Sequence, residues 1–308
     1  MPRMPCTVAV AQINPRLGDV DANLALHADR AEAARRRGAD VVVFPELALT
    51  GYFLKDMVPA VAVRLDAPVM QSLKDLSRDI GLVVGFVEET DDYRFYNSAA
   101  YLHDGAIVHV HRKAYLPTYG LFDEARYLAR GDRIRSFDAR FGRSALLICE
   151  DLWHPSTVYV AALDHALTLI CPSSSPLRGV RDGEVQDDNA RHWELLNTVY
   201  ARTYGMHIIY ANRVGFEDGV GFWGGSEIVD PTGTRLAKAQ YYDEDLIVAE
   251  LDLQAVRRQR LAAPLLRDED IDLTINELLR IRGRPAESGP AVAAPRARRR
   301  TARRAGGG

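Results

Sequence analysis

Cysteine is scarce in this sequence, which has only Cys6, Cys149 and Cys171 among its 308 residues. Such a small, odd and widely spaced set argues against a disulfide framework and against a metal site built from closely spaced cysteines. Free thiols are typical of a reducing compartment. We therefore expect a cytoplasmic protein without a metal site.

Long apolar runs are also absent. A membrane-spanning helix needs about 18 or more consecutive apolar residues, and no run in the chain approaches that length. The opening segment, MPRMPCTVAVAQI, lacks the long apolar region and the cleavage site of a signal peptide. The sequence therefore predicts no membrane partner and no export signal.

Lysine is rare as well, since only four of the 39 basic residues are lysine: Lys55, Lys74, Lys113 and Lys238. The formal net charge of -3 conceals an asymmetry, because residues 284–308 hold seven arginines against the single acid Glu287. That segment is rich in Pro, Ala and Gly and has no apolar periodicity. We expect residues 283–308 to form a disordered, solvated tail, with no nucleic acid as partner.

Residues 1–282 alternate strand and helix signals without an obvious linker, so we expect them to form one domain. The run CTVAVAQI, a helix capped by Asp19 or Asp21 and stopped by Gly38, and the run ADVVVFPE make a βαβ opening. Further helices are expected near 61–79, from about Ser156, and over 187–204, 253–260 and 270–281. Many apolar strands with few helices favour two packed sheets, each covered on its outer side.

Three strand-like runs end in a polar residue with chemical capacity: Glu46, Lys113 and Cys149. Strand ends are where a rigid scaffold brings side chains together. The acids Glu150 and Asp151 follow Cys149 directly, and nearby negative charge disfavours a thiolate. An ammonium from Lys113 would offset that charge, while Glu46 would accept the thiol proton. If the segment is extended, Glu150 need not face the sulfur, because successive side chains then point to opposite sides.

Three segments together carry a resemblance to a known family: FPELALTGY, HRKAYLPTYGLFDEARY and LLICEDLWHP. In this order and spacing they resemble the nitrilase superfamily of carbon–nitrogen hydrolases. The resemblance implies an α/β fold of the four-layer αββα sandwich type, a catalytic triad of Glu46, Lys113 and Cys149, and a homodimer or higher homo-oligomer. It also implies that Glu124 helps to position the substrate and the catalytic groups. Such a hydrolase needs no cofactor.

Within the superfamily the motifs divide between two groups. KAYLPTYGLFDEARYLARGD and ICEDLW resemble the glutaminase domain of glutamine-dependent NAD synthetases, whereas NRVGFEDGVGFWGGSEIVDPTG resembles free-standing amidases of the carbamoyl-putrescine type. No ATP-binding loop follows in the chain, so we expect that it does not make NAD by itself.

We predict a hydrolase of a small linear amide, which could be an ω-amide, a glutamine-like compound or an N-carbamoyl compound. It would release ammonia through a thioester. The alternatives are a nitrilase, an acyl transferase, an ammonia-supplying glutaminase partner of a separate synthetase, and a binding protein without catalysis.

Candidate substrate contacts lie next to the expected triad: Tyr119, Glu150 and Trp153. The resemblance to glutaminase domains implies that Tyr119 and Glu150 hold an amino group of the substrate. The segment CPSSSPLRG adds candidates for binding a carboxylate at the other end of the substrate: Ser174, Ser175 and Arg178.

Other residues have a simpler structural interpretation. Cys6 and Cys171 lie in strand-like runs without neighbouring motifs, and we expect both in the core. His109 and His111 are two residues apart on an expected strand and resemble half of a metal site, but we expect a solvated or hydrogen-bonded pair because no further ligand cluster follows. His154 invites a cysteine–histidine dyad, which is unnecessary where the triad already supplies a base and a cation.

Overall fold

A computed structural model of the chain describes residues 6–177 and 188–283. Its contacts divide the chain into two units, Met1–Arg267 and Asp268–Gly308. In the second unit, helix α8 (Ile271–Arg282) begins where the Asp270 side chain accepts a hydrogen bond from the Leu273 N–H. The tail expected after residue 283 lies outside the described residues, and the single domain over 1–282 stays a prediction.

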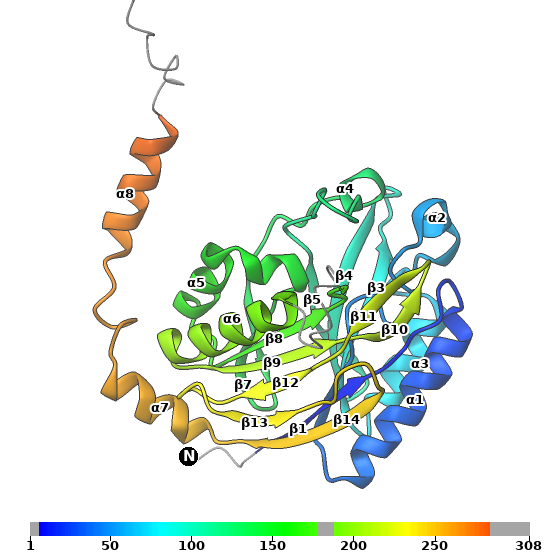
Figure 1. Cartoon of the computed structure of the whole chain (residues 1–308), viewed down its shortest axis with the longest axis horizontal. Helices are drawn as coiled ribbons and strands as arrows, with labels where there is room; N and C mark the ends of the chain where they lie inside the picture. The colour runs from blue at the N-terminus through cyan, green and yellow to red at the C-terminus, as the bar shows by residue number, and fades with distance from the viewer. Residues whose placement is uncertain (1–5, 178–187, 284–308) are drawn as a thin grey trace, which may run out of the picture. The chain divides into compact units, whose positions relative to one another are not determined.

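The first unit contains two six-stranded sheets and a hairpin (Figure 1). The first sheet has the spatial order β14 (Asp245–Leu251), β1 (Cys6–Gln12), β2 (Val41–Val43), β3 (Gly81–Glu89), β4 (Phe95–His103) and β5 (Ala106–Arg112). The second has the order β13 (Arg235–Lys238), β12 (Glu227–Val229), β9 (His207–Asn212), β8 (Thr168–Ser173), β7 (Gly142–Leu146) and β6 (Ser136–Ala139). The hairpin joins β10 (Val214–Glu217) to β11 (Val220–Trp223).

The two sheets share one pairing pattern. The strands β1, β2 and β3 pair in parallel, as do β7, β8 and β9, and the outer strands of both sheets pair antiparallel. Parallel strands need covered faces on both sides, because their crossover connections place helices against the sheet. Both sheets are therefore buried between two layers.

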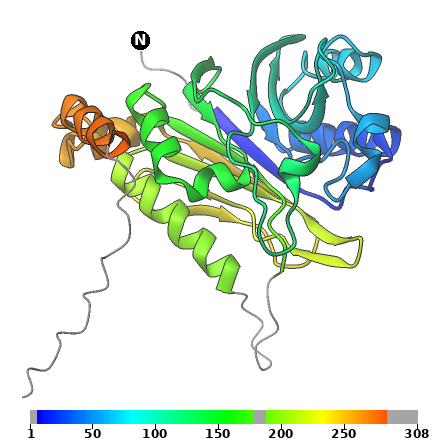
Figure 2. The same cartoon turned by 90° about the horizontal axis from the view of Figure 1, so that it is seen from above.

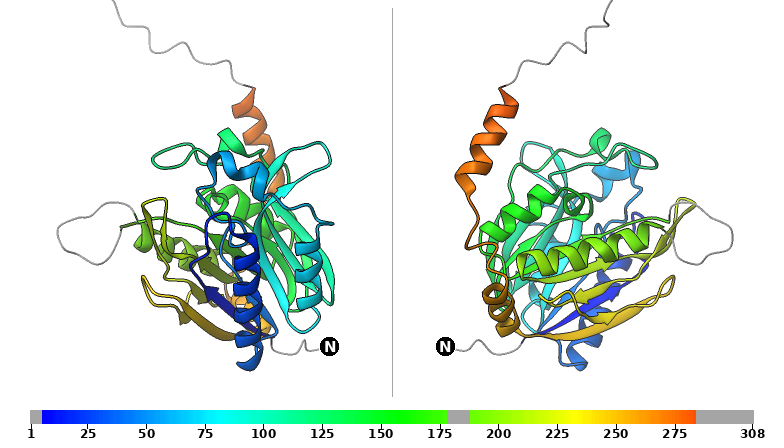
Figure 3. Two further views of the ribbon diagram at one scale, coloured as in Figure 1. Left: turned by 90° about the vertical axis from the view of Figure 1, so that its right-hand side faces the viewer. Right: turned by 60° about the vertical axis from the view of Figure 1, so that its left-hand side comes forward.

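The helices of the first unit supply those covering layers (Figures 1 and 2). Their bounds are α1 (Val20–Arg36), α2 (Val58–Val61), α3 (Pro68–Leu76), α4 (Glu124–Tyr127), α5 (Pro155–Leu163), α6 (Asp188–Tyr204) and α7 (Leu253–Ala262), with 3₁₀ turns η1 (Lys55–Met57) and η2 (Cys149–Trp153). Helices α1 and α3 contact the outer face of the first sheet, and α6, with α5 beside it, covers the second (Figure 3). The predicted four-layer αββα sandwich is confirmed.

Alternation along the strands explains the two apolar cores. In β1, Val8 and Val10 belong to the core between the sheets, whereas Ala9 and Ala11 belong to the core under α1 and α3. Successive side chains of a strand point to opposite faces, so a continuous apolar run fills both cores at once. The same division recurs in β2, β3 and β4.

The helix predictions agree with the structure except at one place. The α1 helix begins at the predicted cap, where Asp19 accepts a hydrogen bond from the Ala22 N–H. The helix expected near 61–79 is wrong in its first part, because the backbone is extended at Ala62 and α3 starts only at Pro68. Proline suits the first turn of a helix, where its missing N–H costs nothing.

Candidate active site

Glu46 lies just past the end of β2, in a segment that passes very close to β3. A Cβ atom added to Gly85 of β3 would lie 2.5 Å from the Leu47 nitrogen and 2.7 Å from the Pro45 oxygen. Only glycine leaves room for this approach. Leu47 itself has a φ of 50°, so the chain turns sharply just after the carboxylate. The position of Glu46 therefore depends on a glycine in the neighbouring strand.

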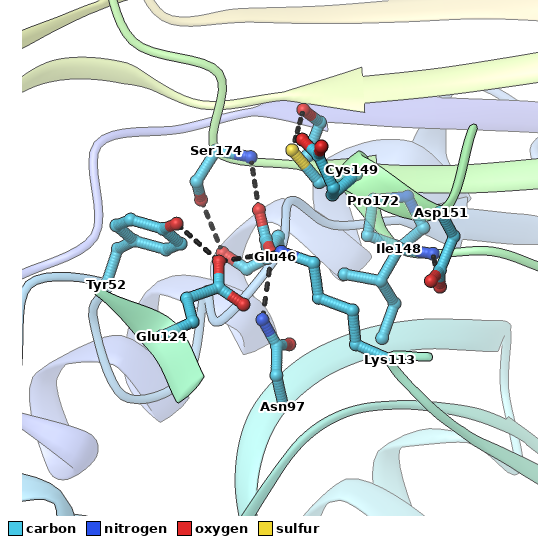
Figure 4. Close-up of polar contacts among 12 residues, drawn as sticks. Glu46, Tyr52, Asn97, Lys113, Glu124, Ile148, Cys149, Asp151, Pro172 and Ser174 are labelled. Atoms are coloured by element: carbon cyan, nitrogen blue, oxygen red, sulfur yellow. Dashed lines mark hydrogen bonds and ion pairs between the residues drawn. The ribbon is translucent and has the colours of Figure 1, made fainter. Parts of the chain in front are cut away.

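The Glu46 carboxylate is buried and accepts three hydrogen bonds (Figure 4). Its Oε1 atom accepts from Asn97 Nδ2 at 2.8 Å and from Lys113 Nζ at 2.7 Å. Its Oε2 atom accepts from the Ser174 N–H at 2.7 Å. The first two partners come from the first sheet and the third from the second, so Glu46 joins the two sheets.

Lys113 follows β5 directly, and its side chain is fully buried. Its backbone N–H donates to the Asn97 carbonyl, and its own carbonyl accepts from the Gly131 N–H, each at 2.8 Å. Its ammonium donates to Glu46 Oε1 and to Glu124 Oε1, both at 2.7 Å. Burial by itself lowers the pKa of Lys113, but the two carboxylates outweigh it and hold that pKa well above its ordinary value. The side chain is therefore a permanent ammonium.

Glu124 begins α4, and its carboxylate has fewer hydrogen-bond partners than that of Glu46. Besides the Lys113 ammonium, its Oε1 atom accepts a 2.5 Å hydrogen bond from the Tyr52 hydroxyl, while its Oε2 atom has no hydrogen-bond partner within the described residues. Burial raises the pKa of Glu124 to about 7, against the lowering effect of Lys113. This carboxyl group therefore changes charge near neutral pH.

Cys149 starts the η2 turn, three residues after the end of β7. Its φ is 44°, a left-handed conformation that is strained for a residue with a Cβ atom. The thiol is buried, and it accepts a 3.3 Å hydrogen bond from the Ser173 hydroxyl, to which Tyr210 donates in turn at 3.4 Å. Burial and the charge of Glu46 raise the thiol pKa, while Lys113 and Ser173 lower it. The net result is a thiol that stays protonated at rest.

Glu150 and Asp151, the two acids that follow Cys149, point to different surroundings, and the sequence argument did not predict which. That argument treated the segment as extended, which is wrong, because the chain turns into a 3₁₀ helix at Cys149. Glu150 turns toward Tyr119, whose hydroxyl donates to its two oxygens at 3.1 and 2.9 Å. Asp151 is fully buried and binds backbone N–H groups instead.

The remaining predicted substrate contacts have the following surroundings. Trp153 is half-buried and stacks on His192 with ring centroids 4.1 Å apart. Ser174 binds Glu46 through its N–H and its hydroxyl. The Ser175 hydroxyl accepts from Asn189 Nδ2 at 2.8 Å and from Trp193 Nε1 at 2.9 Å. Arg178 lies outside the described residues. The predicted contacts with substrate stay predictions.

The sequence argument missed several residues of this site, and each gave a faint signal. Asn97 is a polar residue in the middle of an apolar strand, and Ser173 is the first of three consecutive serines. Tyr52 closes the motif that contains Glu46. Gly85 interrupts a run of apolar residues in β3. A buried strand position occupied by a polar or very small residue is therefore the pattern to look for.

The structural interpretations of Cys6, Cys171 and His111 are confirmed, whereas the expectation of a solvated or hydrogen-bonded His109 is wrong for its Nε2 atom, which is buried without a hydrogen-bond partner among the described residues. Cys6 and Cys171 are buried strand residues. His111 is buried and its Nε2 atom lies 2.8 Å from Asp151, while His109 stacks on Phe137. Within residues 6–177 and 188–283 no group of three or more side chains is placed to hold a metal ion. None of the described helices combines the length and the apolar character that crossing a membrane requires.

Comparisons with known proteins agree with this geometry. The glutamine-dependent NAD(+) synthetase of Acinetobacter baylyi is 32% identical over 84% of this chain and 47% of its own length. The N-carbamoylputrescine amidase of Solanum tuberosum is 28% identical over 83% of this chain and 89% of its own. A solved carbon-nitrogen hydrolase from Helicobacter pylori G27 has a TM-score of 0.81 at 27% identity, covering 91% of this chain and 99% of that one.

The chain spans about half the length of the curated NAD synthetases that it matches. Residues 7–261 match the model of the family described as carbon-nitrogen hydrolase. That match includes every described residue of the buried cluster around Lys113. The chain therefore belongs to the carbon-nitrogen hydrolase family of the nitrilase superfamily.

Proposed function

We propose that the protein hydrolyses a small linear amide through a thioester on Cys149. The observation that carries this proposal is the arrangement of one ammonium between two buried carboxylates beside a buried thiol. In the proposed roles Glu46 is the general base and acid, Lys113 binds the oxyanion, and Glu124 holds Lys113 in place.

The first half of the reaction forms the thioester. The Cys149 sulfur attacks the amide carbon while its proton passes to Glu46, so no free thiolate has to persist in the buried site. Lys113 and the backbone N–H of Glu150 stabilise the oxygen as it becomes negative. The C–N bond then breaks as Glu46 returns the proton to the leaving nitrogen, and ammonia or an amine departs.

The second half regenerates the thiol. Water attacks the thioester carbon and gives a proton to Glu46, and the same two donors stabilise the second oxyanion. The C–S bond breaks, the carboxylic acid is released, and the sulfur takes back the proton from Glu46. A raised thiol pKa makes sulfur a reluctant leaving group, so its hydrogen bond from Ser173 assists this step.

The substrate that we propose carries an amino group at its far end and is an ω-amide, a glutamine-like compound or an N-carbamoyl compound. The Glu150 carboxylate and the Tyr119 hydroxyl form one hydrogen-bonded pair next to Cys149, and a carboxylate favours a cationic group. The printed names of two relatives point the same way, because glutamine and N-carbamoylputrescine both combine an amide-type nitrogen with a distant amine.

A panel of compounds tests the proposal: glutamine, asparagine, ω-amides of dicarboxylic acids, N-carbamoyl amines and simple nitriles. Ammonia release and the intact mass of the protein are measured, with Cys149→Ala as the control. We expect ammonia from amides bearing a distant amine and an acyl adduct on Cys149. Preferential turnover of nitriles would replace the amidase with a nitrilase, and the absence of any adduct would favour a binding role.

A second candidate is an ammonia-supplying glutaminase that works with a separate synthetase. The identity with an NAD synthetase over 84% of this chain favours it. Turnover of glutamine alone, and only after a synthetase is added, would select this function over an independent amidase.

We further propose that the enzyme is a homodimer or a larger homo-oligomer and works in the cytoplasm. The oligomer follows from the family resemblance, and sedimentation that finds only monomer would contradict it. The reducing compartment is supported by three buried cysteines that are all unpaired.

A further inference from the structure

Asp151 is the buried acid two residues beyond the thiol, and the proposed chemistry gives it no role. Its carboxylate is fully buried and has four hydrogen-bonding partners. Its Oδ1 atom accepts from the Ala114 and Tyr115 N–H groups, both at 2.9 Å. Its Oδ2 atom accepts from the Ile148 N–H at 3.0 Å and contacts His111 Nε2 at 2.8 Å.

These four partners come from two different sheets. Ala114 and Tyr115 directly follow Lys113 beyond β5 of the first sheet, and His111 belongs to β5 itself. Ile148 directly precedes Cys149 beyond β7 of the second sheet (Figure 4). The Asp151 carboxylate therefore binds both the backbone that follows Lys113 and the backbone that precedes Cys149.

The chemistry of the contact suits an ionised carboxylate. Such a group only accepts hydrogen bonds, and three of its four partners are backbone N–H groups that only donate. With Nε2 of His111 carrying its proton, all four contacts are donated to the carboxylate. A buried charge is costly unless it is hydrogen-bonded in this way.

We propose that Asp151 is a positioning residue that fixes Lys113 and Cys149 relative to each other, with His111 completing the contact. This inference rests on the proposed function, because the distance between the Cys149 thiol and the Lys113 ammonium affects the rate only if both groups take part in the reaction. A reacting group misplaced by about 1 Å can lose about 100-fold in rate. Asp151 touches neither substrate nor sulfur, so it acts only through the two backbone segments that it joins.

The substitution Asp151→Asn tests this role with little change in shape. An amide has one acceptor oxygen, so it can keep the bonds from Ala114 and Tyr115 but must turn an NH₂ group toward the Ile148 N–H. The probe is iodoacetamide, a small amide that alkylates thiols, and intact mass and peptide mapping report the labelling rate of Cys149. Labelling needs no knowledge of the natural substrate.

We expect Asp151→Asn to slow the labelling of Cys149 by about 100-fold at constant pH. The matched control is Glu227→Gln, which also replaces a buried, hydrogen-bonded carboxylate by an amide, on β12. It should change the labelling rate by less than about 3-fold, as expected for a site without shared partners. In a Lys113→Met background, Asp151→Asn should add almost nothing, because the ammonium to be positioned is gone.

His111 variants keep the inference testable if Asp151→Asn does not fold, as judged by circular dichroism. His111→Phe removes one donor and should slow labelling by about 10-fold, the value of one hydrogen bond to a charged group. His111→Gln restores a donor and should recover most of the rate. Equal rates for the two variants would overturn the role of the contact.

The outcomes separate the two proposals. If wild-type Cys149 is not labelled, the proposed function falls, and the inference falls with it. If the wild type is labelled and a folded Asp151→Asn reacts as fast, only the inference falls. Equal slowing in Glu227→Gln, or an additive loss in the Lys113→Met background, would also overturn it, because either result indicates a general effect of burial.

Discussion

The buried charge clusters around Lys113 and around Arg213 both lie in the first unit, and they differ in how their charges are matched. The Lys113 ammonium faces two carboxylates, Glu46 and Glu124, at 2.7 Å each. The Arg213 guanidinium faces one, Glu217, at 2.5 Å. All of these side chains are nearly or fully buried. The first cluster carries an excess of negative charge, and the second is balanced.

The balance of charge decides what each pair can do. The guanidinium of Arg213 also donates to Asn14 and to the Pro15 carbonyl, and the carboxylate of Glu217 accepts from the Tyr52 and Phe53 N–H groups. These contacts hold the segments around Asn14 and around Tyr52 against the β10–β11 hairpin. In the unbalanced cluster, burial raises the pKa of Glu124 to about 7. Burial, with the charge of Glu46 as a smaller cause, thus lets the Glu124 carboxyl group change charge near neutral pH, whereas the matched pair of Arg213 and Glu217 has a structural role.

Tyr52 connects the two clusters. Its backbone N–H donates to Glu217 at 2.8 Å, and its hydroxyl donates to Glu124 at 2.5 Å. The Arg213–Glu217 pair therefore holds Tyr52 in place, and Tyr52 in turn lowers the pKa of Glu124 in the Lys113 cluster. The comparison predicts that substitutions in the Lys113 cluster reduce the rate, whereas substitutions in the Arg213 pair reduce stability.

The largest effect is expected from removing the thiol beside the unbalanced cluster. Cys149→Ala should lower turnover by about 10,000-fold or more without unfolding, because the nucleophile is gone. Cys6→Ala and Cys171→Ala serve as controls and should keep most of the activity, since both residues only pack in the core. Ammonia release and thermal melting are measured for all three. An equal loss of activity in the three variants would indicate packing and not catalysis.

Removing the cation of the unbalanced cluster should be the next largest effect. Lys113→Met should lower kcat by about 100- to 1,000-fold or more, because it removes an oxyanion donor. It also leaves two buried carboxylates side by side, so one of them takes up a proton. The control is Lys55→Met, which removes an exposed lysine paired with Asp218. Similar rates for Lys113→Met and the wild type would remove Lys113 from the proposed mechanism.

Breaking the balanced pair should affect stability instead of chemistry. Arg213→Met leaves Glu217 buried without its partner, which typically costs about 3–5 kcal/mol in the free energy of unfolding. Urea denaturation measures that loss, with Arg64→Met as a control that breaks an exposed pair with Asp91 and should cost much less, because solvent screens such a pair. Below the transition, the folded fraction should still label at Cys149. Full stability together with lost labelling would reverse the distinction between the clusters.

The smallest effect is expected at the residue that joins the two clusters. The Tyr52 hydroxyl lowers the pKa of Glu124, so Tyr52→Phe should raise that pKa above its value of about 7. If ionised Glu124 is the form that holds Lys113, activity is lost as the pH falls through this pKa. The acid limb of the kcat/KM profile should therefore move to higher pH, with little change at alkaline pH. A shift to lower pH would contradict this role.

Much of this site could be predicted because it lies where strands end. Glu46, Lys113 and Cys149 each follow a strand-like run, and the end of such a run is a local property of the sequence. The burial of each sheet on both of its faces was also predictable from local sequence. In a run such as VAVA of β1, apolar residues occupy both faces of the strand.

The hydrogen-bond partners could not be predicted, because they depend on which segments meet in space. The three serines at 173–175 are alike in sequence, yet one donates to the Cys149 thiol, the next binds Glu46, and the third holds helix α6. The Asp151 side chain points where it does because a 3₁₀ turn starts at Cys149. The pattern of apolar residues gives no sign of that turn. Hydrogen-bond partners that are far apart in the chain produce no periodic pattern in the sequence.

The contact between Ser174 and Glu46 joins residues that are 128 positions apart and that follow strands of different sheets. Closing so long a loop costs conformational entropy, which the chain recovers only when both sheets have docked. The reactive centre is therefore among the last parts of the molecule to form during folding. In refolding from denaturant, helical signal should return before the thiol becomes reactive, and compact intermediates should be inactive. Chains that have not completed folding should therefore show no reactive thiol at Cys149.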